Sequence, residues 1–217
     1  MEQKPFKFCK SAELVLLSGK RASTLKELLD GLKTLPDSVV YYHTHRFLIQ
    51  HEYISPEPPN DFAYWTTNVL LERILGEKLA AIDIINYPTI SDLKNGIIRI
   101  IENNMETDGE RIAPEGMEFN FMRVKTFIIE TGFEARNLKE LYTAIKEVPI
   151  RSIYFHIAQA RLLFSKREND FSLWLREELH EDELANDISK LDPYTWTLER
   201  LRNRLVKMLE ERLDEQN

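Results

Sequence analysis

The sequence has few of the residues that mark several common protein classes. Its single cysteine, Cys9, excludes an internal disulfide. None of its seven glycines has the spacing of a phosphate- or dinucleotide-binding loop, and no serine stands as in a nucleophile elbow. We therefore expect no cofactor, and the sequence carries no common hydrolase signature.

Long apolar runs and blocks of positive charge are missing as well. No run approaches the roughly 18 to 20 residues that cross a bilayer, and the start MEQKPFKFCK lacks the apolar core of a signal peptide. The net charge is −7, and lysine and arginine are scattered among acidic residues. The sequence therefore indicates no positively charged patch that would bind a nucleic-acid backbone. We therefore expect a cytoplasmic protein with neither a membrane nor a nucleic acid as partner.

What is present is the composition of a soluble globular protein. The chain has 217 residues, of which 43% are hydrophobic and 30% charged. This balance is far from that of a disordered chain, and the length allows one large domain or two small ones.

The chain contains an internal similarity between its two halves. Residues 6–43 align without a gap on residues 119–156, and about a dozen pairs are identical, where chance would give two or three. Cys9 falls on Met122, which suggests a small apolar packing role. Further on, Asn-Asp-Phe-x-x-Trp recurs at residues 60–65 and 169–174.

This similarity predicts a tandem duplication. Between the copies lies the segment NNMETDGERIAPEGME, which has the composition of a connection. We predict one repeat unit at 1–108, a linker at 109–117 and a second repeat unit at 118–217. The two units are expected to pack about a pseudo-twofold axis.

The pattern within each unit predicts about five helices, so the expected fold class is mainly α. Thr24 with Glu27, and Asn137 with Glu140, have the spacing of capping boxes that open a first helix. Asp61 and Asp170 are predicted to cap a third helix. Residues 6–18 and 119–131 are ambiguous between strand and helix, which leaves a small β contribution open.

Two motifs give the chain a resemblance to a known family. Tyr41-Tyr42-His43 precedes the first Asn-Asp-Phe-x-x-Trp motif, and Tyr154-Phe155-His156 precedes the second. The chain resembles an uncharacterised bacterial and archaeal family of unknown function over nearly its full length. The resemblance implies a shared fold but no reaction, cofactor or catalytic residue.

The sharpest candidates for chemistry are His43 with Asp61 and His156 with Asp170. A carboxylate that orients an imidazole is a feature of acid–base and metal sites. The alternative interpretation is structural: the aspartate caps a helix, and the histidine packs against the start of that helix. We favour the structural interpretation, because both copies keep the pair.

Other candidates are weaker. Trp65, Trp174, Tyr41 and Tyr154 are candidates for lining a ligand pocket, although such aromatic residues usually belong to a core. A metal site is not expected at His43, His45 and His51. The spacing of two between His43 and His45 points their side chains to different faces of a helix, and Ala158 replaces His45 in the second copy.

The sequence thus predicts a binding or protein-interaction module without catalysis. A protein partner, a second copy of the chain and a small ligand all remain open. The alternative is a hydrolase or transferase that uses one of the His–Asp pairs.

Overall fold

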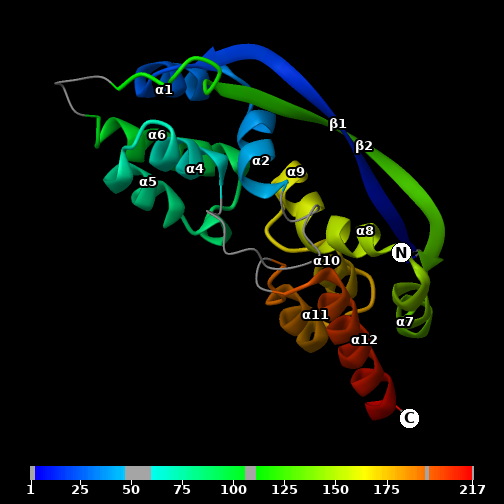
Figure 1. Cartoon of the computed structure of the whole chain (residues 1–217). Helices are drawn as coiled ribbons and strands as arrows, with labels where there is room; N and C mark the ends of the chain where they lie inside the picture. The colour runs from blue at the N-terminus through cyan, green and yellow to red at the C-terminus, as the bar shows by residue number, and fades with distance from the viewer. Residues whose placement is uncertain (1–2, 47–59, 106–110, 194–195, 217) are drawn as a thin grey trace. The chain divides into compact units, whose positions relative to one another are not determined.

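The computed structural model describes residues 3–46, 60–105, 111–193 and 196–216 (Figure 1). Within these residues, each of two long strands is followed by a series of helices, so the fold is not a purely helical bundle. None of the helices in the described part of the chain is long and apolar enough to cross a membrane.

The strands are β1 (Phe6–Ala22) and β2 (Phe119–Ala135), each 17 residues long, and they pair in a two-stranded antiparallel sheet. Phe6 and Phe8 are buried and Lys7 between them is exposed, the alternation expected of a strand with one covered face. The same alternation opens β2.

The prediction of a mainly α chain is therefore wrong, and the protein is mixed α and β. The two ambiguous segments are strands that continue to Ala22 and Ala135. The sequence left them undecided because alternating phenylalanine and β-branched residues favour a strand, whereas the Glu-Leu-rich end of the first segment tolerates a helix. Gly19 and Gly132 lie within the strands at φ of 80° and 83°, a conformation that favours glycine.

The helices of the first half follow β1. Thr24 caps the first of them by accepting from the Glu27 amide, as the sequence predicts, and Pro36 precedes the second. The helices are α1 (Leu25–Thr34), α2 (Asp37–His45), α4 (Asp61–Asn68), α5 (Arg73–Ala80), the short 3-10 helix η1 (Ile84–Asn86) and α6 (Ile90–Glu102).

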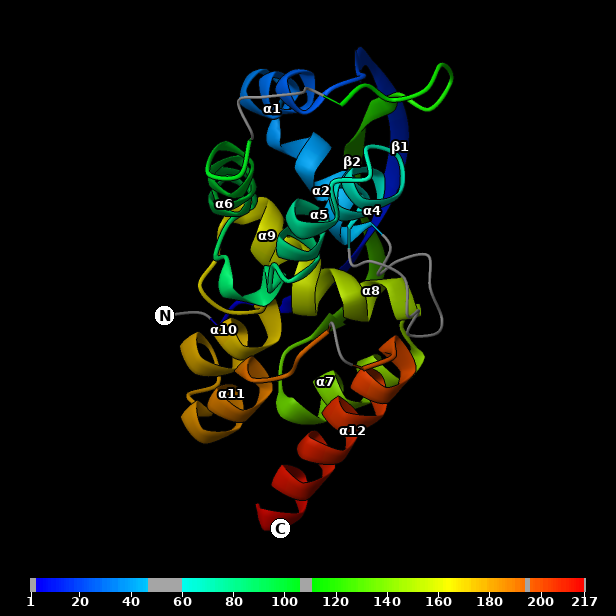
Figure 2. The same ribbon diagram turned by 60° about the vertical axis from the view of Figure 1, so that its left-hand side comes forward.

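The helices of the second half follow β2 in a similar order. Asn137 caps the first by accepting from the Glu140 amide. The helices are α7 (Leu138–Glu147), α8 (Ile150–Tyr154), the π-helical turn η2 (Phe155–Gln159), α9 (Ala160–Phe164), α10 (Asp170–Glu177), α11 (Asp182–Ser189) and α12 (Leu198–Glu215). The long helix α12 packs along α7 (Figure 2), and Arg202 on it donates to the Val148 carbonyl beyond the end of α7.

The chain forms two compact units, which we name by the histidine that each contains. The His43 unit comprises the described residues among 13–50 and 55–125, and the His156 unit those among 1–12 and 126–217. Each strand therefore begins in one unit and ends in the other. The repeat units at 1–108 and 118–217 remain a prediction. Each compact unit contains residues from both of them.

Each unit has a core of its own. In the His156 unit, Phe6 and Phe8 from β1 join apolar residues of α7, α8, α10, α11 and α12. In the His43 unit, Phe119 and Phe121 from β2 are buried in the same way as Phe62 and Leu28. The apolar start of each strand is thus buried among helices of the other sequence half.

Candidate functional site

The two predicted His–Asp pairs form in the structure. His43 near the end of α2 lies against Asp61 in the first turn of α4, with 2.7 Å between His43 Nδ1 and Asp61 Oδ2. His156 in η2 lies against Asp170 in the first turn of α10, with 2.8 Å between the corresponding atoms.

The second nitrogen of each ring also has a partner. The Met122 amide donates to His43 Nε2 at 3.0 Å, and the Cys9 amide donates to His156 Nε2 at 2.8 Å. Because a backbone N–H can only donate, Nε2 must accept, which leaves the proton of a neutral ring on Nδ1, facing the aspartate. Both histidines therefore join an aspartate to the backbone of a strand.

Burial dominates the electrostatics of both histidines. The side chain of each is 4% exposed. Burial lowers the pKa of His43, although the hydrogen bond and charge of Asp61 oppose this shift. Burial also lowers the pKa of His156; Asp170 opposes the shift, and the positive charge of Lys166 adds to it. Both rings are neutral near pH 7.

The two carboxylates differ in their surroundings. The Asp61 side chain is 60% exposed, whereas that of Asp170 is 13% exposed and also accepts from Lys166 Nζ at 2.5 Å. Burial would raise the pKa of Asp170, but the hydrogen bonds from His156 and Lys166 outweigh it and hold this pKa below its usual value.

The predicted helix caps are one residue off. Asn60 and Asn169, not Asp61 and Asp170, accept from the amides three residues on, at 2.8 Å and 2.9 Å. Both asparagines are buried, and each also donates to a carbonyl at the end of the next helix. The aspartates are thereby left to orient the histidines.

The two candidate tryptophans lie in the cores, each within its own unit. Trp65 Nε1 donates to the Met117 carbonyl and Trp174 Nε1 to the Lys4 carbonyl, both at 2.8 Å. Their side chains contact the first phenylalanine of a strand edge-on, with ring centroids 5.7 Å and 5.6 Å apart.

The two candidate tyrosines are also buried. Tyr41 donates to Glu13 Oε1 at 2.9 Å, and its ring stacks on His45. Tyr154 is 2% exposed. Sequence reasoning missed Glu13 and Arg46, which lie 3.8 Å apart beside Tyr41; the signal available was a single carboxylate within an apolar strand.

The remaining candidates do not assemble into a metal site in the described residues, where no group of three possible ligands occurs. His45 contacts Thr44 and Tyr41, and His51 lies outside the described residues. Cys9 contributes its backbone to the histidine contact, while burial, with Glu130 and Asp170 nearby, raises the pKa of its thiol.

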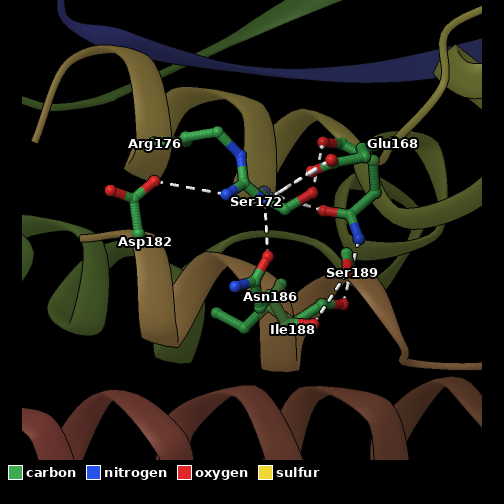
Figure 3. Close-up of polar contacts among 8 residues, drawn as sticks. Glu168, Ser172, Arg176, Asp182, Asn186, Ile188 and Ser189 are labelled. Atoms are coloured by element: carbon green, nitrogen blue, oxygen red, sulfur yellow. Dashed lines mark hydrogen bonds and ion pairs between the residues drawn. The ribbon is translucent and has the colours of Figure 1, made fainter. Parts of the chain in front are cut away.

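A charged network on α10 and α11 was not predicted. Figure 3 shows Arg176 between Glu168, Asp182 and Asn186, with N–O distances of 3.2, 3.2 and 2.9 Å. Charged and polar side chains on a helix surface carry little sequence signal, so only the structure brings these groups together.

These contacts define a mixed α/β protein in which buried histidines tie helices to strand backbones. The chain belongs to a family described as a family of unknown function, DUF5752, whose model matches residues 3–210. The predicted membership of an uncharacterised family is confirmed, while the duplicated motifs as its mark remain a prediction.

One solved structure is similar to nearly the whole chain. The structure of OrfY from Thermoproteus tenax has 29% sequence identity and a TM-score of 0.81, covering 96% of this chain and 95% of that one. No curated protein matches the chain.

Proposed function

We propose that this protein is a protein-interaction module that binds its partner through an apolar surface of the His43 unit, and that its His–Asp pairs support the fold rather than catalysis. The observation that carries the proposal is a group of large apolar side chains exposed on and beside α4 and α5. At the positions of Leu71 and Ile74, the other unit carries the exposed polar residues His180 and Glu183.

The histidines support a structural role because both nitrogens of each ring are used within the fold. A general base needs a nitrogen that reaches a substrate proton. Here Nδ1 faces an aspartate and Nε2 accepts from a strand amide, in both units. A ring that is 4% exposed also offers a substrate almost no surface.

The apolar surface lies on α4, α5 and the segment before β2. Arg111 donates to the Leu71 carbonyl and Trp65 to the Met117 carbonyl, which brings the segment before β2 against α4 and the turn that precedes α5. Its exposed members, with their exposed fractions, are Tyr64 (55%), Leu71 (57%), Ile74 (73%), Ile112 (72%) and Met117 (50%). Large apolar side chains exposed on neighbouring segments, with charged groups beside them, are typical of a protein-binding site.

The equivalent corner of the His156 unit is polar. His180 precedes α11 as Leu71 precedes α5, and both residues have a positive φ, 57° and 58°. In the sequence alignment, Glu183 takes the place of Ile74, and Arg176 on α10 contacts Asp182 and Asn186 on α11 (Figure 3). The fold itself therefore does not require an apolar surface here.

The partner that fits this surface is a protein segment with apolar side chains and at least one acidic group. Arg111 stands at the edge of the surface, 51% exposed, and pairs with Glu72 at 2.9 Å. Arg73, which follows Glu72 in the sequence, is also exposed. Arginine at the edge of an apolar surface is a common feature of protein interfaces.

The test compares full-length parent protein with Ile74→Glu and with the control Glu183→Gln. A partner retained by the parent is identified, purified and titrated against all three proteins. We expect Ile74→Glu to weaken binding by at least about tenfold, because it places a charge in the apolar contact, and Glu183→Gln to leave it unchanged.

Thermal melts of the three proteins check that the substitutions leave the fold intact. The proposal fails if the purified partner binds Ile74→Glu as tightly as the parent, or if the control weakens binding equally. It also fails if the parent retains no protein that the Ile74→Glu variant does not.

A further inference from the structure

The starts of the two strands dock onto the helices by one shared set of contacts. We define the strand starts as residues 4–9 and 117–122. The first docks in the His156 unit on Trp174, Phe171 and His156, and the second docks in the His43 unit on Trp65, Phe62 and His43.

The contacts agree in type and in length. In both sites the tryptophan donates to the carbonyl of the first residue of the strand start, at 2.8 Å. The first phenylalanine stacks on a helix phenylalanine, with centroids 5.0 Å and 5.3 Å apart. The last residue of the strand start donates its amide to the histidine.

In each strand start, only the contacts of the two phenylalanines depend on which side chain is present. Phe8 and Phe121 are completely buried, and Lys7 and Asn120, between the phenylalanines, are exposed. The hydrogen bonds to tryptophan and histidine use backbone atoms, which every non-proline residue has. Each docking site therefore accepts an extended Phe-x-Phe segment.

The docking is reciprocal between the two sequence halves. The first half, β1 with α1 to α6, fills the site on the second half with residues 4–9; the second half, β2 with α7 to α12, fills the site on the first half with residues 117–122. Neither histidine has its Nε2 partner within its own half. Each half thus completes a site on the other.

We propose that a second copy of this chain supplies these strand starts, giving a dimer in which the first half of each chain pairs with the second half of its partner. The contacts within each unit are the same in monomer and dimer, so contact energy does not favour either form. Within one chain, each half meets the other at a local concentration of the order of millimolar. The monomer is therefore favoured when the chain concentration is well below that value, and the dimer competes with it near that value. Refolding near that concentration is expected to produce the exchanged dimer.

The test uses full-length chains in a Cys9→Ser background. One chain carries Lys7→Cys and the other Glu130→Cys; Lys7 Nζ and Glu130 Oε1 are 3.9 Å apart on β1 and β2 and belong to different halves. The two chains are refolded together at about 1 mM and joined with a short bis-maleimide. We expect a cross-link between the chains, because exchange places residue 7 of one chain beside residue 130 of the other.

A matched pair within one half separates exchange from aggregation. Lys33 and Glu102 form an ion pair inside the first half, so exchange leaves them on the same chain. Chains with Lys33→Cys and Glu102→Cys are expected to give no cross-link between chains after the same treatment.

A single chain with both Lys7→Cys and Glu130→Cys is the positive control and should cross-link internally at low concentration. The proposal is overturned if this control reacts but the co-refolded chains give no cross-link between them. It is equally overturned if the Lys33 and Glu102 pair links chains to the same extent, because aggregation alone would do so.

Discussion

The histidine sites of the two units share their geometry but differ in how their carboxylates meet solvent. In both, an aspartate at a helix start orients a ring that accepts a strand amide. The Asp61 side chain is largely exposed, whereas that of Asp170 is only 13% exposed and is paired with Lys166. Both sites keep the hydrogen bond from a strand amide to the histidine Nε2. This indicates that both histidines serve to hold the start of a strand.

The largest effect that tests this comparison is the loss of the histidines. We expect His43→Ala to reduce the free energy of unfolding by about 2–3 kcal/mol, because it leaves a cavity and an unpaired amide. His156→Ala should cost about 1 kcal/mol more, because it also leaves the Asp170 carboxylate, which is only 13% exposed, with one hydrogen bond fewer. Denaturant unfolding of each variant measures both values.

His180→Ala is the control for these two substitutions, since His180 is exposed. Equal losses at His43 and His156 would show that the burial of the aspartate has no energetic consequence. Losses near zero at both would contradict the structural role of the histidines.

An intermediate effect is expected from acid. The unfolded chain binds protons at its histidines near the ordinary pKa of 6.5, whereas burial lowers the pKa of His43 and His156 in the folded protein. Below that pH the unfolded state therefore holds more protons, so stability falls as pH falls. Protonation would also turn Nε2 into a donor that faces the donor amide of the strand.

The lowered pKa of Asp170 adds a second loss at lower pH, as the pH falls through and below its ordinary value of 3.8. Melting temperatures between pH 8 and pH 3, with NMR titration of the imidazoles, measure both steps. Replacing both histidines with glutamine should flatten the upper step. An unchanged melting temperature from pH 7 to pH 5 would contradict the assignment of neutral, buried rings.

The smallest effect concerns the turns before α5 and α11. Leu71 and His180 have φ values of 58° and 57°, so glycine at either position should stabilise the fold by about 0.5–1 kcal/mol. Thermal unfolding measures the gain. Leu71→Gly should in addition weaken partner binding, and His180→Gly should not; equal binding by both variants would remove Leu71 from the proposed interface.

Several features of the sites could be predicted from the sequence. The recurrence of His43 and Asp61 as His156 and Asp170 identified both pairs, because side chains that must meet leave a paired pattern in the sequence. The assignment of the caps was off by one residue, since asparagine and aspartate are both good caps and stand side by side at 60–61 and at 169–170.

Other features could not be predicted. The partner of His43 Nε2 is the backbone amide of Met122, 79 residues away, and a backbone amide has no sequence signature. The exposed corner at Leu71 and Ile74 was missed because apolar residues at helical spacing are usually taken as core.

The sequence alone determined where α1 and α7 begin, because capping residues act over a few neighbouring residues. It also determined that Phe-x-Phe opens each half. Only the tertiary structure decided that these segments are long strands and that each docks on the helices of the other half. The physical reason is that an apolar segment specifies that it is buried, whereas the surface that buries it depends on contacts between residues far apart in the chain.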